Sequence, residues 1–226
     1  QDVAEDALYR HLLRHDADYG SVVLMEVKTG EIKAMANLGK NKDGSYTERY
    51  NYAVGSQGLT EPGSTMKLAS LMALFEDSDM ELNDTIHANW GKYKFYNHIM
   101  TDAKPEGYGI LTVKQAFAYS SNIAIAKMVV KHFGNKPQKF INYLQKFGLG
   151  NKIDFQMVGE AEPYIKNTFD SSWSGISLPW ICHGYEMKVS PLHTLTLYNA
   201  VANDGKMIKP IIVKEVRKAD KVLEKY

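Results

Sequence analysis

One stretch of the sequence constrains the fold more than any other: a turn followed by an almost continuous apolar run. Pro62-Gly63 is a turn dipeptide, and residues 68–75 read Leu-Ala-Ser-Leu-Met-Ala-Leu-Phe. A helix that is apolar nearly all round is buried rather than half-exposed. We therefore predict a buried helix that begins at Ser64 and ends near Glu76-Asp77, with the rest of the chain packed around it.

Ser64 and Lys67 stand three residues apart at the start of this predicted helix. Side chains at positions i and i+3 share a helix face, so an amine would lie beside a hydroxyl. Burial disfavours the charged form of a lysine and lowers its pKa toward that of a useful base. The pair therefore fits serine-type acyl transfer. A Ser-x-x-Lys pair also arises about once by chance in a chain of this size, so the alternative is an exposed helix start with a solvated lysine.

A second polar motif, Ser120-Ser121-Asn122, interrupts a helical region. Thr112 caps one predicted helix, 113–118, and a second predicted helix runs from Ile123 to about Phe133 and ends before a glycine. A break between two helices can project a hydroxyl and an amide into a cleft. The same serines are good N-cap residues. The two interpretations are compatible, because a cap can also fix the hydroxyl that does chemistry.

The remaining pattern predicts strands near both ends of the chain and helices between them. The other predicted elements are a surface helix (1–16), a hairpin (21–27 and 31–36), a polar loop (37–50), two helices (136–147 and 191–202) and a strand (207–216) followed by a charged tail. Residues 78–110 and 151–189 have too little periodicity to predict a long element. Strands at the ends with a helical middle, and no internal repeat or linker, indicate one α+β domain.

Composition excludes several classes of function. The chain has 27 basic and 26 acidic residues, a balance that argues against a nucleic-acid-binding surface. A single cysteine, Cys182, permits no disulfide framework and no cysteine-based metal site, and next to His183 it is better explained as a packed thiol than as a nucleophile. His11 and His15 have helical spacing but no third ligand nearby, so we expect neither metal nor cofactor.

With both motifs in view, the chain resembles the transpeptidase domain of class B penicillin-binding proteins. The resemblance rests on four segments, Glu61–Lys67, Tyr119–Ala124, Gly184–Leu192 and Tyr198–Lys206, and covers almost the whole chain. Within that family the chain looks most like the division-type, FtsI-like enzymes. The resemblance implies a penicillin-binding-protein or serine β-lactamase-like α+β fold, an antiparallel sheet packed against helices, with residues 1–226 as one transpeptidase domain.

The resemblance also implies peptidoglycan D,D-transpeptidation of stem peptides that end in D-Ala-D-Ala, inhibited by β-lactam antibiotics. Ser64 would attack the penultimate D-alanine carbonyl, and Lys67 would take its proton. Ser120 would relay a proton toward the leaving D-alanine, and Asn122 would hold Lys67 and the substrate amide. The Ser64 N–H would form half of an oxyanion hole, an effect worth about 3 kcal/mol per donor. Further substrate-binding residues would be Ser121, Gly184 and Tyr185.

One part of the family's pattern does not appear where it is expected. The third motif of the family, Lys-Thr/Ser-Gly, follows the second motif on a strand, and no such triplet follows Asn122. The only Lys-Thr-Gly is Lys28-Thr29-Gly30, in the predicted hairpin turn, where the glycine supplies the backbone angle that the turn needs. We therefore expect the chain to be truncated before the third motif, to lack the C-terminal sheet strands, and to be inactive or impaired on its own.

Two rival functions share the serine–lysine pair. A class D β-lactamase-like hydrolase would need a dry, apolar pocket around the lysine and a water for deacylation, whereas a non-enzymatic β-lactam sensor or scaffold would need only acylation or docking. The resemblance further implies a periplasmic domain whose parent is anchored in the inner membrane by an N-terminal segment outside this sequence. Its expected partners are a glycosyltransferase and division proteins, with no nucleic acid.

Overall fold

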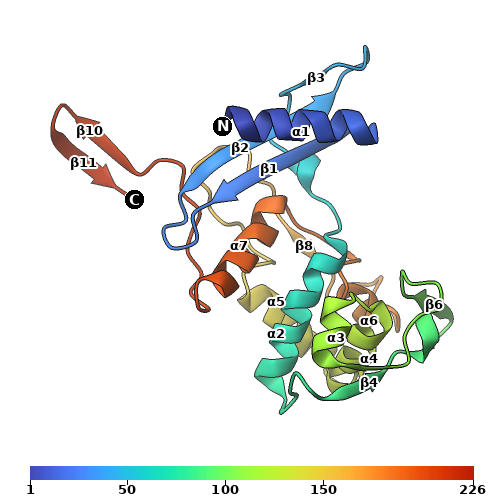
Figure 1. The fold of residues 1–226 in the computed structure, drawn as a ribbon. Helices are drawn as coiled ribbons and strands as arrows, with labels where there is room; N and C mark the ends of the chain where they lie inside the picture. Colours follow the sequence, from blue (N-terminus) through green and yellow to red (C-terminus); the bar gives the residue numbers. More distant parts are fainter. The chain divides into compact units, whose positions relative to one another are not determined.

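A computed structural model describes residues 1–226, which form two compact units (Figure 1). The first unit comprises Gln1–Thr60, Asn151–Pro163 and Val189–Tyr226, and the second comprises Glu61–Gly150 and Tyr164–Lys188. Both predicted motifs lie in the second unit. The expectation that residues 1–226 act as one domain stays a prediction.

A three-stranded antiparallel sheet forms the centre of the first unit. Its strands are β1 (Tyr19–Met25), β2 (Ile32–Lys40) and β3 (Tyr46–Thr47), in the order β1-β2-β3. The β1–β2 hairpin confirms the sequence prediction. The prediction of a polar loop over 37–50 was wrong at both ends, because β2 continues to Lys40 and Tyr46 is buried against Leu12 and Leu38.

Helices pack on both faces of this sheet. Side chains alternate between the two faces of a strand, so Leu38 and Met35 of β2 point in opposite directions. Leu38 packs with Leu12 of α1 (Asp2–His15), and Met35 packs in the cluster that contains Leu192 of α7 (Pro191–Ala202). The two helices therefore cover opposite faces. α7 confirms the helix predicted over 191–202, with Ser190 as its N-cap and Pro191 at its first position.

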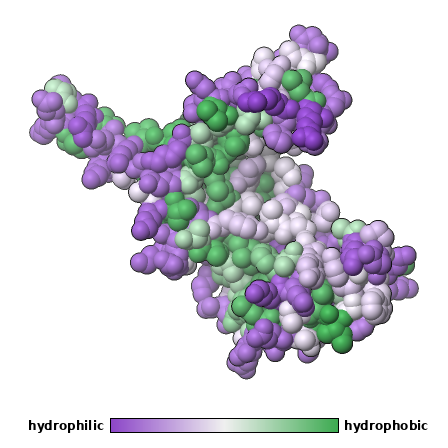
Figure 2. Space-filling view, in the orientation of Figure 1, coloured by the Kyte–Doolittle hydropathy of each residue, from purple (hydrophilic) through white to green (hydrophobic).

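The C-terminal strand predicted over 207–216 was wrong. Of residues 207–214 only Ile211 makes a β-bridge, to Glu31 beside the β1–β2 turn, and a strand requires a partner along its length. The last two residues of the predicted strand, Glu215 and Val216, pair elsewhere. The stretch interpreted as a charged tail instead forms a hairpin, β10 (Glu215–Lys218) and β11 (Lys221–Lys225). Figure 2 shows that this hairpin is mostly hydrophilic.

The second unit is a cluster of helices around α4. Its helical elements are η2 (Gly63–Met66), α2 (Lys67–Asp77), η3 (Asn89–Gly91), α3 (Val113–Ala118), α4 (Asn122–Phe133), α5 (Pro137–Lys146) and α6 (Ser177–Ile181). Ile123, Ile125 and Val129 of α4 are completely buried, and α2, α3, α5 and α6 all contact that helix. The bounds predicted for α2, α3, α4 and α5 from periodicity and caps are confirmed within three residues, whereas η3 and α6 were not predicted. None of the helices in the chain is long and apolar enough to cross a membrane.

Short strands fill the stretches of the second unit where the sequence predicts no long element. They pair as β4 (Thr85–His87) with β7 (Ile110–Thr112), β5 (Lys92–Phe95) with β6 (His98–Thr101), and β8 (Tyr164–Ile165) with β9 (Met187–Lys188). Strands of two to four residues are too short to give a period in the sequence. β6 contacts α4, which brings Thr101 and Asp102 to the start of that helix.

Candidate active site

Ser64 lies in a tight turn just before α2. The α-helix itself begins at Lys67, and Ser64 belongs to the 3₁₀ turn η2, so the expected helix start at Ser64 is corrected by three residues. In a 3₁₀ turn the side chains at i and i+3 eclipse one another. Ser64 and Lys67 therefore project to the same side. Ser64 is exposed, whereas Lys67 is only 1% exposed.

Two hydrogen bonds with a neighbouring loop hold this turn, one between backbone groups and one to a side chain. The N–H of Gly63 donates to the oxygen of Gly184 at 3.1 Å, and the N–H of Glu186 donates to Oε1 of Glu61 at 3.0 Å. Gly184 has a φ of 92°, and a Cβ there would lie 2.0 Å from the oxygen of Gly63. Only glycine fits such a contact. Gly184 therefore lies directly against the nucleophile turn, and the half-exposed Tyr185 follows it.

Lys67 joins the two predicted motifs. Its Nζ donates to the main-chain oxygen of Ser120 at 2.6 Å, to Ser120 Oγ at 2.8 Å and to Asn122 Oδ1 at 2.6 Å. An ammonium has three protons, so these three acceptors satisfy its charged form completely. The structure thus brings together three of the four residues predicted as catalytic and places the fourth, Ser64, one turn before Lys67.

Burial shifts the acid–base properties of Lys67. It lowers the pKa of the amine from 10.5 to about 8, while the negative charge of the Asp102 carboxylate acts in the opposite direction. Near pH 8 a large fraction of Lys67 is therefore neutral. A neutral amine donates only two hydrogen bonds and has a lone pair that can accept a proton.

The two titratable neighbours of Lys67 that follow α6, Cys182 and His183, are uncharged near neutral pH. Cys182 is completely buried, its Sγ donates to the oxygen of Pro179 at 3.1 Å, and burial raises the pKa of the thiol. Burial, followed by the charge of Lys67, lowers the pKa of His183 to about 4. Cys182 is thus the packed thiol that the sequence predicts, because a thiolate is required for nucleophilic attack.

Ser120 occupies a backbone position that normally favours glycine. It follows α3 with a φ of 53°, its N–H donates to the oxygen of Phe117 at 3.0 Å, and the N–H of Ser121 donates to the oxygen of Ala116 at 2.9 Å. This is a Schellman motif, whose left-handed residue is usually glycine. A left-handed non-glycine residue costs about 1–2 kcal/mol. Strain of this kind is concentrated at functional positions.

Ser121 performs the capping that the sequence left open between two serines. It is fully buried as the N-cap of α4, its Oγ accepts from the N–H of Ala124 at 3.1 Å, and the same Oγ donates to Asp102 Oδ2 at 2.9 Å. Ser120 contacts Lys67 and Ser121 caps the helix, so the two roles fall on different residues. The substrate-binding role expected for Ser121 stays a prediction. The Ser121 hydroxyl already has two partners, the N–H of Ala124 and the carboxylate of Asp102.

Sequence reasoning missed Thr101 and Asp102. The Nδ2 of Asn122 donates to the oxygen of Thr101 at 2.9 Å, and the N–H of Ile123 donates to Asp102 Oδ1 at 3.1 Å. Both residues lie in the stretch 78–110, where no periodic pattern indicates an element. The one local signal is an aspartate at the end of a short apolar segment, and that signal is too common to identify a site.

The remaining sequence candidates belong to the chain's first unit, whereas Lys67 belongs to the second. Lys28-Thr29-Gly30 forms the turn before β2, with Gly30 at a φ of 73°. His11 and His15 stack with ring centroids 6.0 Å apart on α1, and no group of three or more His, Cys, Asp or Glu side chains in the chain could hold a metal.

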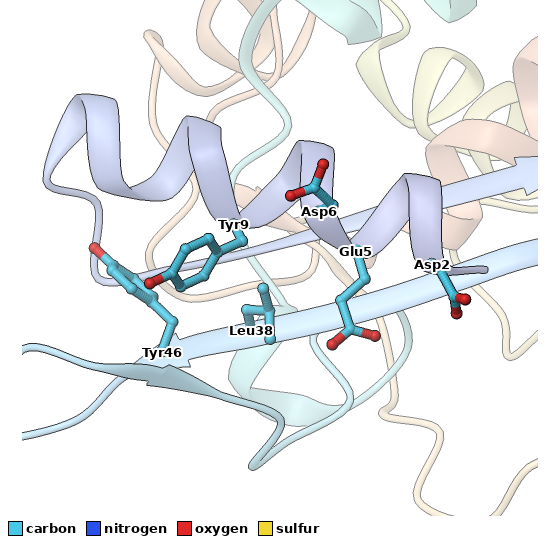
Figure 3. A pocket seen from close by; sticks show the side chains of 6 residues that line it. All are labelled: Asp2, Glu5, Asp6, Tyr9, Leu38 and Tyr46. Atoms are coloured by element: carbon cyan, nitrogen blue, oxygen red, sulfur yellow. The ribbon is translucent and has the colours of Figure 1, made fainter.

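A cavity of about 310 Å³ lies between α1 and the strands β2 and β3 (Figure 3). Three carboxylates line it, together with Tyr9, Leu38 and Tyr46. Tyr9 and Tyr46 meet edge to face, and Asp6 pairs with Arg10 along the helix. Nothing in the cavity indicates a ligand beyond the acidic residues of the helix start.

Comparisons with known proteins agree with this geometry. Residues 20–226 match the family model "Penicillin binding protein transpeptidase domain". The probable peptidoglycan D,D-transpeptidase PbpC of Pseudomonas aeruginosa is 28% identical over 211 residues, which cover 92% of this chain and 36% of that protein. The peptidoglycan D,D-transpeptidase FtsI of Escherichia coli K12 is 26% identical over 203 residues, 88% of this chain and 33% of that protein. The chain therefore spans about a third of the length of these curated relatives.

A solved structure confirms the predicted fold. The apo TP domain of Burkholderia pseudomallei penicillin-binding protein 3 matches with a TM-score of 0.79 and 23% identity, over 97% of this chain and 61% of that chain. At this identity the likeness shows the fold alone. It confirms the α+β, penicillin-binding-protein type of fold that the two motifs suggested.

Proposed function

The chain belongs to the penicillin-binding protein transpeptidase family, and on that basis we propose that it carries the acyl-transfer site of a peptidoglycan D,D-transpeptidase. The observation that carries the proposal is the environment of Lys67: a buried amine with three acceptors from the second motif, one turn after an exposed serine. The names of the relatives PbpC and FtsI support the same reaction.

In the proposed reaction, neutral Lys67 takes the proton of Ser64 as Oγ attacks the penultimate D-alanine carbonyl. The new Oγ–C bond forms, and the C–N bond to the terminal D-alanine breaks. The proton passes from Lys67 through the Ser120 hydroxyl to the leaving nitrogen, along the 2.8 Å contact between Nζ and Oγ. The amine of a second stem peptide then attacks the ester carbonyl. The new C–N bond replaces the Oγ–C bond, and the proton of the amine returns through Lys67 to Ser64 Oγ.

The other predicted site residues fit supporting roles. Oδ1 of Asn122 accepts a hydrogen bond from Lys67, and Nδ2 of Asn122 donates one of its two protons to the oxygen of Thr101. A primary amide has a second N–H donor, which we assign to a carbonyl of the substrate. The N–H of Ser64 would stabilise the oxyanion, and Gly184 and Tyr185 would border the bound peptide. Ser121 would affect the bound peptide only indirectly, by positioning its chain neighbours Ser120 and Asn122.

A β-lactam would acylate the same serine. Oγ of Ser64 would attack the lactam carbonyl and open the ring, and the nitrogen that leaves would stay tethered to the adduct. Because no product diffuses away, the acyl-enzyme would persist. β-Lactams and stem peptides are thus the proposed ligands of the part of the site that the first two motifs build.

We place the parent protein in cell-wall synthesis, for division or cell shape, as a periplasmic domain anchored in the inner membrane. The resemblance to FtsI supports this assignment. A glycosyltransferase and division proteins are the proposed partners. Fractionation of cells that express the full-length parent would test the location, and recovery in the soluble cytoplasmic fraction would contradict it.

The rival function, a class D β-lactamase-like hydrolase, requires an apolar pocket around the lysine. Three polar acceptors within 2.8 Å of Nζ are the opposite of such a pocket, and this observation favours the transpeptidase. A chromogenic cephalosporin separates the two functions. A single slow acylation is expected, and rapid multiple turnover would favour the hydrolase.

Intact-mass spectrometry after incubation with penicillin tests the acylation site. The chain should gain the mass of one penicillin, and Ser64→Ala should gain none. Thr65→Ala is the matched control, because Thr65 carries the neighbouring hydroxyl but directs Oγ1 to the oxygen of Pro62 at 2.9 Å. A chain that gains no mass, or a Ser64→Ala protein that still does, would contradict the proposal.

A further inference from the structure

Asp102 sits behind the second motif with both carboxylate oxygens in use. It is 8% exposed and follows the end of β6. Oδ1 accepts from the N–H of Ile123 at 3.1 Å, and Oδ2 accepts from Oγ of Ser121 at 2.9 Å. One residue earlier, the oxygen of Thr101 accepts from Nδ2 of Asn122 at 2.9 Å. The end of β6 therefore contacts three consecutive residues at the start of α4.

These contacts satisfy groups that would otherwise be costly to bury. The first N–H groups of a helix have no partner within the helix. Asp102 accepts from the N–H of Ile123, and Ser121 accepts from the N–H of Ala124. A carboxylate at this position is also favoured by the positive end of the helix dipole. The start of α4 is thus fixed in place by side chains rather than only by packing.

The residues fixed in this way are the ones that receive Lys67. Ser121 lies between Ser120 and Asn122, which supply all three acceptors of Nζ. Ser120 holds a strained φ of 53°, and a strained residue relaxes unless its surroundings hold it. The hydrogen bonds of the Ser121 hydroxyl to Asp102 and to the N–H of Ala124 oppose that relaxation. We propose that Asp102 is a positioning residue, which holds Ser120 and Asn122 in the geometry that receives Lys67.

This inference rests on the proposed function, since it assigns a role in acyl transfer at Ser64. Asp102 has a second effect that a purely structural residue would not have. Its negative charge stabilises the ammonium form of Lys67 and opposes the effect of burial on the lysine pKa. Cys182 and His183, the other titratable neighbours, are uncharged near neutral pH. Removal of the carboxylate charge should therefore move the titration of Lys67 to lower pH.

The test is the rate of penicillin acylation of the whole chain as a function of pH, expressed per mole of folded protein. For Asp102→Asn we expect the plateau rate to fall about 10²-fold, the loss that a displacement of about 1 Å can cause. We also expect the midpoint of the pH profile to move below that of the wild type. The wild type tests the proposed function, and the variants test Asp102.

Two further variants separate positioning from general stability. Ser121→Ala keeps the charge but breaks the contact to Oδ2, so the plateau should fall while the midpoint stays in place. Asp77→Asn is the control, because Asp77 is a buried carboxylate at the other end of α2 that accepts from His132 at 2.7 Å and from Tyr143 at 3.0 Å. It should unfold at a lower temperature with an unchanged plateau and midpoint.

Wild-type plateau and midpoint in Asp102→Asn would overturn the inference, as would an equal loss of rate in Asp77→Asn. If Asp102→Asn does not fold, Ser121→Ala decides: a wild-type plateau overturns the inference, and a lowered plateau at the wild-type midpoint supports it. A wild-type chain that is not acylated at all would instead refute the proposed function.

Discussion

Two helix starts meet at Lys67, and they are held in different ways. At the start of α2 no side chain caps the helix, and the turn that carries Ser64 is held by the backbone contact between Gly63 and Gly184. At the start of α4, two side chains, Ser121 and Asp102, bind the first N–H groups and are buried.

The difference matches the parts that the two starts play in the proposed reaction. An uncapped helix start presents N–H groups and a hydroxyl to a substrate. A capped helix start fixes the positions of Ser120 and Asn122, so that Lys67 meets its three acceptors in a single arrangement. Substitutions that alter the backbone should therefore have the larger effect at the start of α2. Substitutions that remove a side-chain group should have the larger effect at the start of α4.

The largest expected effect is at the residue that the two starts share. Lys67→Ala removes the proposed base and should slow acylation by about 10²–10⁴-fold, the usual contribution of general base catalysis. Lys127→Ala is the matched control: Lys127 is half-buried on α4 and donates to the oxygen of His87 and to Asn89 Oδ1, both at 2.7 Å. Stopped-flow kinetics would measure the acylation rate of both variants. Equal rates for Lys67→Ala and Lys127→Ala would show that Lys67 is not the base.

Gly184→Ala tests the claim that backbone contact holds the first start. The added Cβ would lie 2.0 Å from the oxygen of Gly63, so the free energy of unfolding should fall by more than the strain of a positive φ alone. Gly63→Ala is the comparison, since Gly63 has a φ of 57° and a methyl group added there would meet no atom within 4 Å. It should lose only about 1–2 kcal/mol. Urea denaturation that gives equal losses would contradict the account.

At the second start, Ser120→Gly and Ser120→Ala separate strain from chemistry. Both remove the hydroxyl and should slow acylation to the same extent. Glycine accepts the φ of 53° without strain, whereas alanine does not, so the glycine variant should be the more stable by about 1 kcal/mol. An alanine variant that is equally stable would show that Ser120 is not strained.

The smallest expected effect is at a capped helix start outside the site. Thr112 caps α3 in a capping box with Gln115, through contacts of 3.1 and 2.9 Å. Thr112→Ala should lower the free energy of unfolding by about 1 kcal/mol and leave the acylation rate unchanged. A clear loss of acylation rate would mean that weakening any helix cap in this unit affects Lys67. The effect of Ser121→Ala could then not be assigned to the position of Ser121 beside the Lys67 acceptors.

Local chemistry made the helices predictable from the sequence. Thr112, Ser121 and Ser190 are N-cap residues, and the apolar run after Lys67 indicates burial; all of these features act within a few residues of the chain. The juxtaposition of Ser64 and Lys67 follows from their spacing in the same way.

The features that the sequence did not reveal depend on contacts between distant residues. Asp102 binds Ser121 and Ile123 across 19 and 21 positions, and no pattern within 78–110 points to them. Within the strand predicted over 207–216, residues 207–214 have no β partner except at Ile211, and the strand that forms begins only at Glu215. The β10–β11 hairpin turns through Ala219 at a φ of 49°, without the Asn-Gly or Asp-Gly pair that usually marks such turns.

The most direct test of the central claim is the pH dependence of wild-type acylation by penicillin. Burial lowers the pKa of Lys67 to about 8, so the neutral amine becomes more abundant as the pH rises through that value. The acylation rate should therefore rise with a midpoint near pH 8, and Lys67→Arg, which stays protonated, should show no such rise. A wild-type rate that stays constant from about pH 6 to pH 10, on either side of that midpoint, would contradict the assignment of Lys67 as the base.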